Sequence, residues 1–301
     1  MSNFQDFRIA IFPTVNVNTW KPQGEIQRST VHKDGVWHFG IQAIILQKDS
    51  QNNIFTLTQT RSETVDLSQT KVDQSLATQM IVEDQCDPVK TLRRGLANEL
   101  SVDLDKCRYV EILKDKKKVI TKTYSSNLHA HNREIVYLFL VELGSDAKII
   151  PNMFKIKKTE WVSWSSFVLS SKLHPSNYTK TLRLYTYYGK IVDEISHEIC
   201  NFLNHSKGHP TSSNGDVFRS DETKFYHYVS MHHLGYDFIL DSSLLSTGKF
   251  QCKVYKISLG SPESPKFQGK ATLDRKDFFD PNDIEILTYL DNQHQSSSVP
   301  Q

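Results

Sequence analysis

The sequence predicts an α+β fold, in which a mixed β-sheet is flanked by helices and a second, small β-rich module follows at the C-terminus. Three observations support this fold class. Apolar runs of strand length occur at 37–46, 54–60 and 134–143. A segment with helical spacing lies between them at 88–100. Four more short strand-like runs follow a polar stretch at 205–222, and the length of 301 residues leaves room for one large domain or two smaller ones.

The first elements are expected to be strands joined by turns. Phe7 to Pro13 is predicted to form a short strand, and residues 14–35 are predicted to form loop and turn because they are polar and contain proline and glycine. Trp37 to Leu46 is rich in isoleucine, and Ile54 to Thr60 alternates apolar residues with threonine. With the polar turn Asp49 to Asn53 between them, these two strands are predicted to form a hairpin.

A helix is predicted to begin after Asp87. Aspartate is a favoured N-cap residue, and the next residue, Pro88, suits the first helical position, where a missing N–H costs nothing. One buried stripe is predicted from the three- and four-residue spacing of Val89, Leu92, Leu96 and Leu100. The opposite stripe carries Thr91, Gly95, Asn98 and Glu99.

The middle of the chain is predicted to continue with strands and then a helix. Tyr109 to Leu113 and Lys118 to Thr123 are expected to be strands, and Glu134 to Leu143 is apolar enough for a sheet centre. Trp161 to Phe167 is expected to be a further short strand. Asn177 to Asn204 carries apolar residues at helical spacing and is predicted to be one long amphipathic helix.

The polar, Gly-, Ser- and Pro-containing segment after this helix has the composition of a linker. The predicted units are therefore an N-terminal strand and loop at 1–24, a main domain at 25–204, a linker at 205–222, a small β-rich module at 223–290 and a disordered tail at 291–301. Strands are expected within the module at 225–231, 236–240, 250–259 and 266–273, with a short helix at 281–290.

Composition limits the classes of partner. A net charge of +2, from 36 basic and 34 acidic residues, gives no global field for nucleic acid or an anionic membrane. Four widely spaced cysteines are expected to be free thiols, as in a reducing compartment: Cys86, Cys107, Cys200 and Cys252. With neither a signal-peptide core nor an apolar run of about 20 residues, the chain is expected to be cytoplasmic and to have no membrane partner.

Several motifs resemble the Nudix hydrolase superfamily, in its isopentenyl-diphosphate isomerase-like branch. The string Val31 to His38, followed by the strand Ile41 to Leu46, is similar to the entry of such domains. Glu134 to Phe139 resembles the family strand that opens with a catalytic glutamate, and Glu160 to Trp164 resembles its closing segment. Thr91 to Val102 stands where the metal-binding helix falls. The resemblance covers about residues 25–170.

The family's Nudix box, Gly-x5-Glu-x7-Arg-Glu-U-x-Glu-Glu-x-Gly-U with U a bulky aliphatic residue, is degenerate in this chain. Arg94 and Glu99 match its arginine and last glutamate, and two aliphatic positions are also kept, by Leu96 and Val102. Gly95 and Asn98 stand where the other two helix glutamates belong, and Ser101 replaces the glycine. The outlying glutamate corresponds to Glu83 or Asp84 only if two residues are inserted, since strict spacing selects Cys86.

The resemblance implies hydrolysis of a diphosphate with Mg²⁺ or Mn²⁺ held by helix carboxylates. Positions 95, 98 and 99 lie on one helix face, and only Glu99 is charged. Each missing carboxylate would have supplied about 4 kcal/mol of attraction at about 4 Å. Metal affinity is therefore expected to fall by orders of magnitude. The isomerase activity is not expected, because Ala77 and Gln79 replace the branch's cysteine and metal-binding histidine.

Three hypotheses about function follow. The leading one is a catalytically impaired domain that binds a diphosphate-containing small molecule in a sensing or regulatory role, through Arg94, His38 and His131, with a weak or absent metal site. The second is an active hydrolase that assembles an atypical metal site from Glu99, Glu83 or Asp84, and Glu134, with His131 as a further ligand. Glu134 could also act as a general base, and Asn98 on the helix could offer a metal only a neutral carbonyl oxygen. The third assigns the function to the 223–290 module, through a protein partner.

The same residues also have structural interpretations. Glu99 is equally well an ordinary solvated helix residue, and His32 and His38 are more often structural or surface histidines than ligands. His129 and His131 alternate with Ala130, so they are expected to face the same side of a strand near Glu134.

Overall fold

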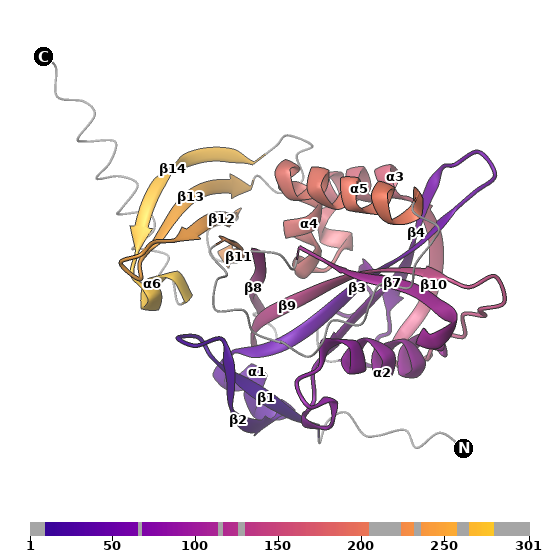
Figure 1. The fold of residues 1–301 in the computed structure, drawn as a ribbon, viewed down its shortest axis with the longest axis horizontal. Helices are drawn as coiled ribbons and strands as arrows, with labels where there is room; N and C mark the ends of the chain where they lie inside the picture. The colour runs from indigo at the N-terminus through magenta and orange to yellow at the C-terminus, as the bar shows by residue number, and fades with distance from the viewer. Residues whose placement is uncertain are drawn as a thin grey trace, which may run out of the picture.

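The structure is a computed structural model built around one large mixed β-sheet (Figure 1). It describes residues 10–65, 68–113, 117–125, 130–204, 224–231, 236–257 and 265–279. Along its main path the strand order is β10-β4-β3-β9-β8-β11-β12-β13-β14. The predicted fold class, a mixed sheet flanked by helices with β-rich C-terminal strands, is confirmed.

The N-terminal segment forms a hairpin and a helix. Strand β1 (Ile11–Asn16) pairs antiparallel with β2 (Lys21–Gln27), and helix α1 (Arg28–Asp34) follows. Its C-cap is Gly35, whose φ of 62° lies in the left-handed region that glycine adopts readily. The expectation of loop over 14–35 was therefore wrong: β2 is almost fully exposed, so it lacks the apolar alternation by which strands are detected.

The centre of the sheet contains the two most apolar strands. Strand β3 (His38–Lys48) pairs parallel with β9 (Ala130–Leu143) and antiparallel with β4 (Ile54–Arg61), as the predicted hairpin requires. The short strands β5 (Val72–Gln74) and β6 (Leu76–Gln79) pair with β4 and β3 respectively. Strand β9 also pairs with β7 (Cys107–Ile112) and β8 (Lys117–Ser125).

Helix α2 (Pro88–Leu100) covers one face of this sheet (Figure 1), and it begins where the sequence predicts. The Asp87 carboxylate caps it by accepting from two backbone N–H groups. Three leucines of the predicted stripe, Leu92, Leu96 and Leu100, are fully buried. The stripe expected to lie opposite is largely buried as well, at Thr91, Gly95 and Glu99, because this side of the helix faces β6 and a loop.

Helices α3 (Trp164–Leu173), α4 (Arg183–Tyr187) and α5 (Gly189–Asn204) cover the other face (Figure 1). Two predictions are corrected here. Strand β10 (Ile156–Ser163) ends at Ser163, whose side chain accepts from Ser166 N–H and starts α3, so 161–167 is only partly strand. The single helix expected over 177–204 is interrupted at Tyr188, which is extended, with ψ 101°.

The C-terminal strands extend the same sheet. Strand β11 (Lys224–Met231) pairs parallel with β8, and β12 (Tyr236–Leu244), β13 (Phe250–Ile257) and β14 (Lys266–Leu273) follow in antiparallel order. Helix α6 (Arg275–Phe279) comes next. Aromatic rings of this module, such as Phe225 and Phe279, pack on Trp20 in one core with the main domain.

Three predicted segments, the linker 205–222, the helix 281–290 and the tail 291–301, lie outside the described residues. Among the helices that the structure describes, none is long and apolar enough to cross a membrane. The four cysteines are free, as expected.

Candidate functional site

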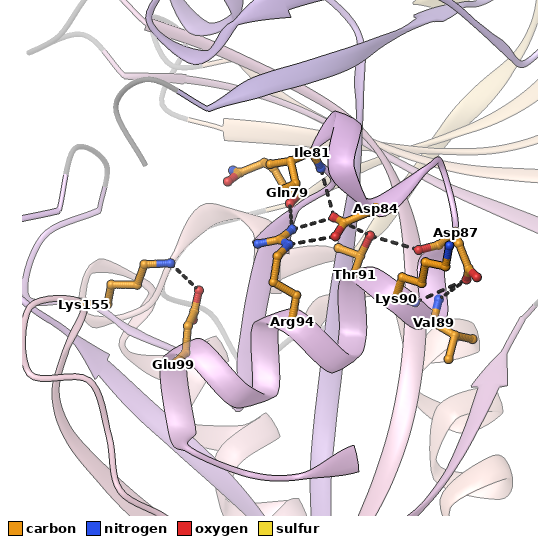
Figure 2. A network of polar contacts seen from close by, with 10 residues as sticks. All are labelled: Gln79, Ile81, Asp84, Asp87, Val89, Lys90, Thr91, Arg94, Glu99 and Lys155. Atoms are coloured by element: carbon orange, nitrogen blue, oxygen red, sulfur yellow. Dashed lines mark hydrogen bonds and ion pairs between the residues drawn. The ribbon is translucent and has the colours of Figure 1, made fainter. Parts of the chain in front are cut away.

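The first group of candidate residues surrounds the N-terminal half of α2. Asp84, at the end of the short 3₁₀ turn Val82–Asp84, is buried, and its carboxylate accepts from Arg94 Nε at 2.8 Å and from Arg94 Nη2 at 2.7 Å (Figure 2). Oδ2 also accepts from the Ile81 N–H at 3.0 Å and from Thr91 Oγ1 at 2.9 Å. Both oxygens are therefore engaged within the protein, in the bidentate geometry that makes arginine–carboxylate pairs strong.

Arg94 joins this pair to the sheet. Its Nη2 also donates to the Gln79 carbonyl at 2.7 Å, so one guanidinium links the 3₁₀ turn, α2 and the end of β6. The pair is mostly buried, with side-chain exposures of 15% for Arg94 and 5% for Asp84. Removing one partner would leave the other charge buried without compensation, so the Asp84–Arg94 pair stabilises the fold.

Gly95 marks a close approach between α2 and β6. A Cβ built on Gly95 would lie 2.8 Å from Thr78 Cγ2 and 3.0 Å from Leu76 Cδ2. Contacts below 3.0 Å require a shift of the neighbours. A side chain at this position, which the Nudix resemblance aligns with a glutamate, would therefore have to displace Thr78 or Leu76.

At the C-terminal end of α2, Glu99 is only 5% exposed and accepts from Lys155 Nζ at 2.8 Å (Figure 2). The expectation of a solvated Glu99 was therefore wrong. Lys155 is 56 residues further along the chain and 22% exposed in its side chain. A cation next to the carbonyl end of a helix is also favoured by the helix dipole.

The loop 144–155, which we call the clamp loop, holds Lys155 in place. Its Ile150 N–H donates to the Leu100 carbonyl at 2.9 Å, and its Asn152 N–H donates to the Glu99 carbonyl at 2.8 Å. Asn152 Nδ2 donates to the Asn98 carbonyl at 3.1 Å. Three carbonyls that an α-helix leaves without partners are therefore satisfied by this loop.

The remaining candidates on this side are solvent-facing. Asn98 and Glu83 are both exposed, and neither side chain makes a hydrogen bond or an ion pair with another residue that the structure describes. Asn98 could offer only a neutral carbonyl oxygen to a cation.

The second group lies on the sheet, around Glu134 of β9. Its buried carboxylate has Oε1 3.7 Å from His38 Nε2, and this oxygen accepts from Gln79 Nε2 at 3.2 Å. The His38 Nδ1 atom lies 2.9 Å from the Val36 carbonyl, which can only accept, so Nδ1 carries a proton and Nε2 is the ring nitrogen that faces Glu134. Gly40 leaves the space into which Glu134 folds, since a Cβ there would be 3.2 Å from Oε1.

Electrostatics favour the charged form of Glu134. Burial raises the pKa of Glu134, but the nearby His38, whose Nε2 lies 3.7 Å away, and the hydrogen bond from Gln79 lower it, and the net pKa is below its ordinary value. For His32, whose ring centroid is 5.4 Å from that of His38, the neutral form is favoured instead. Burial, followed by the charges of His38 and Arg28, lowers the pKa of His32 to about 3.

His131 does not share a face with Glu134. Three positions separate the two residues along β9, and alternate residues of a strand face opposite sides. Its Cβ instead lies 3.0 Å from the Cβ position of Gly35 at the end of α1. His129 lies outside the described residues, so the predicted pairing of His129 with His131 has no structural description.

A divalent ion does not fit the groups present. Mg²⁺ and Mn²⁺ require several free oxygen ligands, preferably carboxylates. Asp84 is engaged by Arg94, Glu99 is engaged by Lys155, and position 95 has no side chain. Within the part of the chain that the structure describes, no three His, Cys, Asp or Glu side chains are placed to hold a metal ion.

The sequence could not have shown Lys155. Its partner is on another element, and a lysine before an apolar residue has no distinguishing local pattern. Asp84 was a candidate metal ligand, as an alternative to Glu83, once a two-residue insertion was allowed, but its pairing with Arg94 was not predicted.

Comparison with known proteins gives similarity only in the arrangement of the chain. No protein-family model and no curated protein sequence matches. Among solved structures, a Nudix hydrolase from M. smegmatis, RenU, is 8% identical with a TM-score of 0.38, and covers 54% of this chain and 87% of its own.

Two further similar structures are named as hydrolases. A C. elegans Ap4A hydrolase is 10% identical with a TM-score of 0.36, over 54% of this chain and 97% of its own. The E. coli dihydroneopterin triphosphate pyrophosphohydrolase is 13% identical with a TM-score of 0.35, over 49% and 94%. At these values the likeness establishes neither a family nor an activity for this chain.

Proposed function

We propose that this chain is a Nudix-superfamily domain protein that binds a diphosphate-containing small molecule in a sensing or regulatory role and hydrolyses it poorly. The single observation that carries the proposal is that two of the acidic candidate metal ligands, Asp84 and Glu99, are already neutralised by Arg94 and Lys155.

This observation bears directly on catalysis. In the chemistry that the Nudix resemblance implies, a divalent ion neutralises the phosphates and activates water. A carboxylate that already accepts from an ammonium or guanidinium group at 2.7–2.8 Å must first give up that partner before it can bind an ion. The loss is not offset elsewhere on α2, because a side chain at position 95 would have to displace Thr78 or Leu76.

The proposed ligand class follows from the resemblance to the Nudix superfamily, and the residues that contact the ligand are proposed as well. His38, His131 and Arg94 are the candidates for ligand contact, with Glu134 retained as a charged group on the sheet. Since Arg94 is held by Asp84, we propose that it positions the end of β6, whose Gln79 side chain contacts Glu134.

The C-terminal strands supply a route by which ligand occupancy could reach a protein partner. Arg183 of α4 donates from Nη1 to Asp237 Oδ2 of β12 at 2.5 Å, and Tyr228 of β11 donates to the same oxygen. All three side chains are buried. This network fixes α4, on the face of the sheet that carries Glu134, to the C-terminal strands.

Hydrolysis assays test the catalytic half of the proposal. Purified protein is incubated with Mg²⁺ or Mn²⁺ and ADP, ADP-ribose or inorganic pyrophosphate. Release of AMP from the two nucleotides, and of phosphate from pyrophosphate, is measured for wild type, Glu99→Gln and Glu134→Gln. We expect slow release that does not differ between the three proteins. Rapid wild-type turnover that Glu99→Gln abolishes would refute the proposal.

Calorimetric titration tests the binding half. With the same compounds in EDTA, we expect at least one diphosphate compound to bind without a divalent ion, and His38→Ala to weaken it. A ligand that binds only when Mg²⁺ is added would show that a metal completes the site, against the proposal.

A further inference from the structure

The clamp loop places the Lys155 ammonium against Glu99, near the C-terminal end of α2. Lys155 Nζ lies 2.8 Å from Glu99 Oε1, and Glu99 is only 5% exposed. The loop backbone is itself fixed by the hydrogen bonds of Ile150 and Asn152 to the last carbonyls of the helix. The ammonium is therefore not a loose surface partner of Glu99.

We propose that Lys155 is a resident cation that excludes divalent ions from a latent cation position formed by Glu99 and Asn98. The inference concerns this position alone and does not require the ligand of the proposed function. Asn98 is exposed and directly precedes the buried Glu99 on α2, so a carboxylate introduced there would add a negative charge in solvent at the same end of the helix.

The reason is electrostatic competition. Only one carboxylate is present, and its charge is cancelled by the ammonium at contact distance. A divalent ion next to Lys155 would meet repulsion from the ammonium, and it would gain little from Glu99 while Lys155 stays. Lys155 and a divalent ion should therefore be mutually exclusive.

A double-mutant cycle tests this. Mn²⁺ affinity is measured calorimetrically for wild type, Asn98→Glu, Lys155→Met and the double variant. We expect no measurable binding by wild type, weak binding by Asn98→Glu, and an affinity for the double variant at least about tenfold higher than for Asn98→Glu. Equal affinities for Asn98→Glu and the double variant would overturn the proposal, as would tight Mn²⁺ binding by wild type.

Two controls keep the test interpretable. Lys157→Met, in the background of Asn98→Glu, removes a lysine whose partner is the exposed Glu63, so it should leave Mn²⁺ affinity unchanged. Lys155→Met alone leaves the Glu99 charge buried without its partner. The second control is therefore Lys155→Met/Glu99→Gln, in which both charges of the pair are removed. It should show no Mn²⁺ binding, and Mn²⁺ binding by it would contradict a site at Glu99.

Discussion

Replacing Gly95 with alanine tests the close approach of α2 to β6, because two effects of opposite sign compete. Alanine in a helix interior is favoured over glycine by about 1 kcal/mol. In this structure its Cβ would meet Thr78 Cγ2 at 2.8 Å and Leu76 Cδ2 at 3.0 Å. Overpacking of that kind costs about 1–3 kcal/mol. The net expectation is a loss of up to about 2 kcal/mol in the free energy of unfolding.

The assay is urea denaturation followed by tryptophan fluorescence, with comparison of the midpoints at a constant slope. Ala97, which is exposed on the same helix, supplies the control: Ala97→Gly should cost about 1 kcal/mol from propensity alone. Gly95→Glu should destabilise more than Gly95→Ala. An alanine variant more stable than wild type would refute the reasoning, since it would show open space at position 95.

Three further predictions concern the buried polar groups. Asp84→Asn should reduce the free energy of unfolding by about 3–5 kcal/mol, because it leaves Arg94 without its charged partner. Asp105→Asn, which removes the charge of an exposed ion pair with Arg93, should change the free energy of unfolding little. Equal losses for the two variants in urea denaturation would contradict a stabilising role of the Asp84–Arg94 pair. His32, neutral when folded, takes up a proton on unfolding below its ordinary pKa of 6.5, so stability should fall as pH decreases from 6.5 toward about 3. His32→Phe should make thermal stability less dependent on pH over that range. An unchanged pH dependence would show that ionisable groups other than His32 cause it. Asp237→Asn should cost about 3 kcal/mol or more by isolating its buried arginine, and a smaller loss would remove the proposed link from α4 to the C-terminal strands.

Elements with strong local signals could be predicted from the sequence. Helix α2 has an aspartate cap, a proline at its first position and leucines at helical spacing, and all three act locally. Strands β3 and β9 are continuous apolar runs because both of their faces are covered. Exposed β2 and the break at Tyr188 lack such signals, since solvent-facing strand residues are not selected for apolar alternation and a single extended residue leaves helical spacing almost intact.

Long-range pairings could not be predicted. The parallel pairing of β11 with β8 joins residues more than 100 positions apart, and it makes the C-terminal strands part of the sheet. The contact of Lys155 with Glu99 depends on a loop conformation that is fixed by backbone hydrogen bonds. The absence of carboxylates at positions 95 and 98 is evident from the sequence, whereas the pairing of Glu99 with Lys155 depends on the fold.

A crystal soaked in Mn²⁺, with anomalous scattering measured at the manganese edge, would show whether a divalent ion binds beside α2. We expect Lys155 Nζ in contact with the Glu99 carboxylate and no manganese peak near α2. A manganese peak within bonding distance of Glu99, with Lys155 displaced, would contradict this expectation.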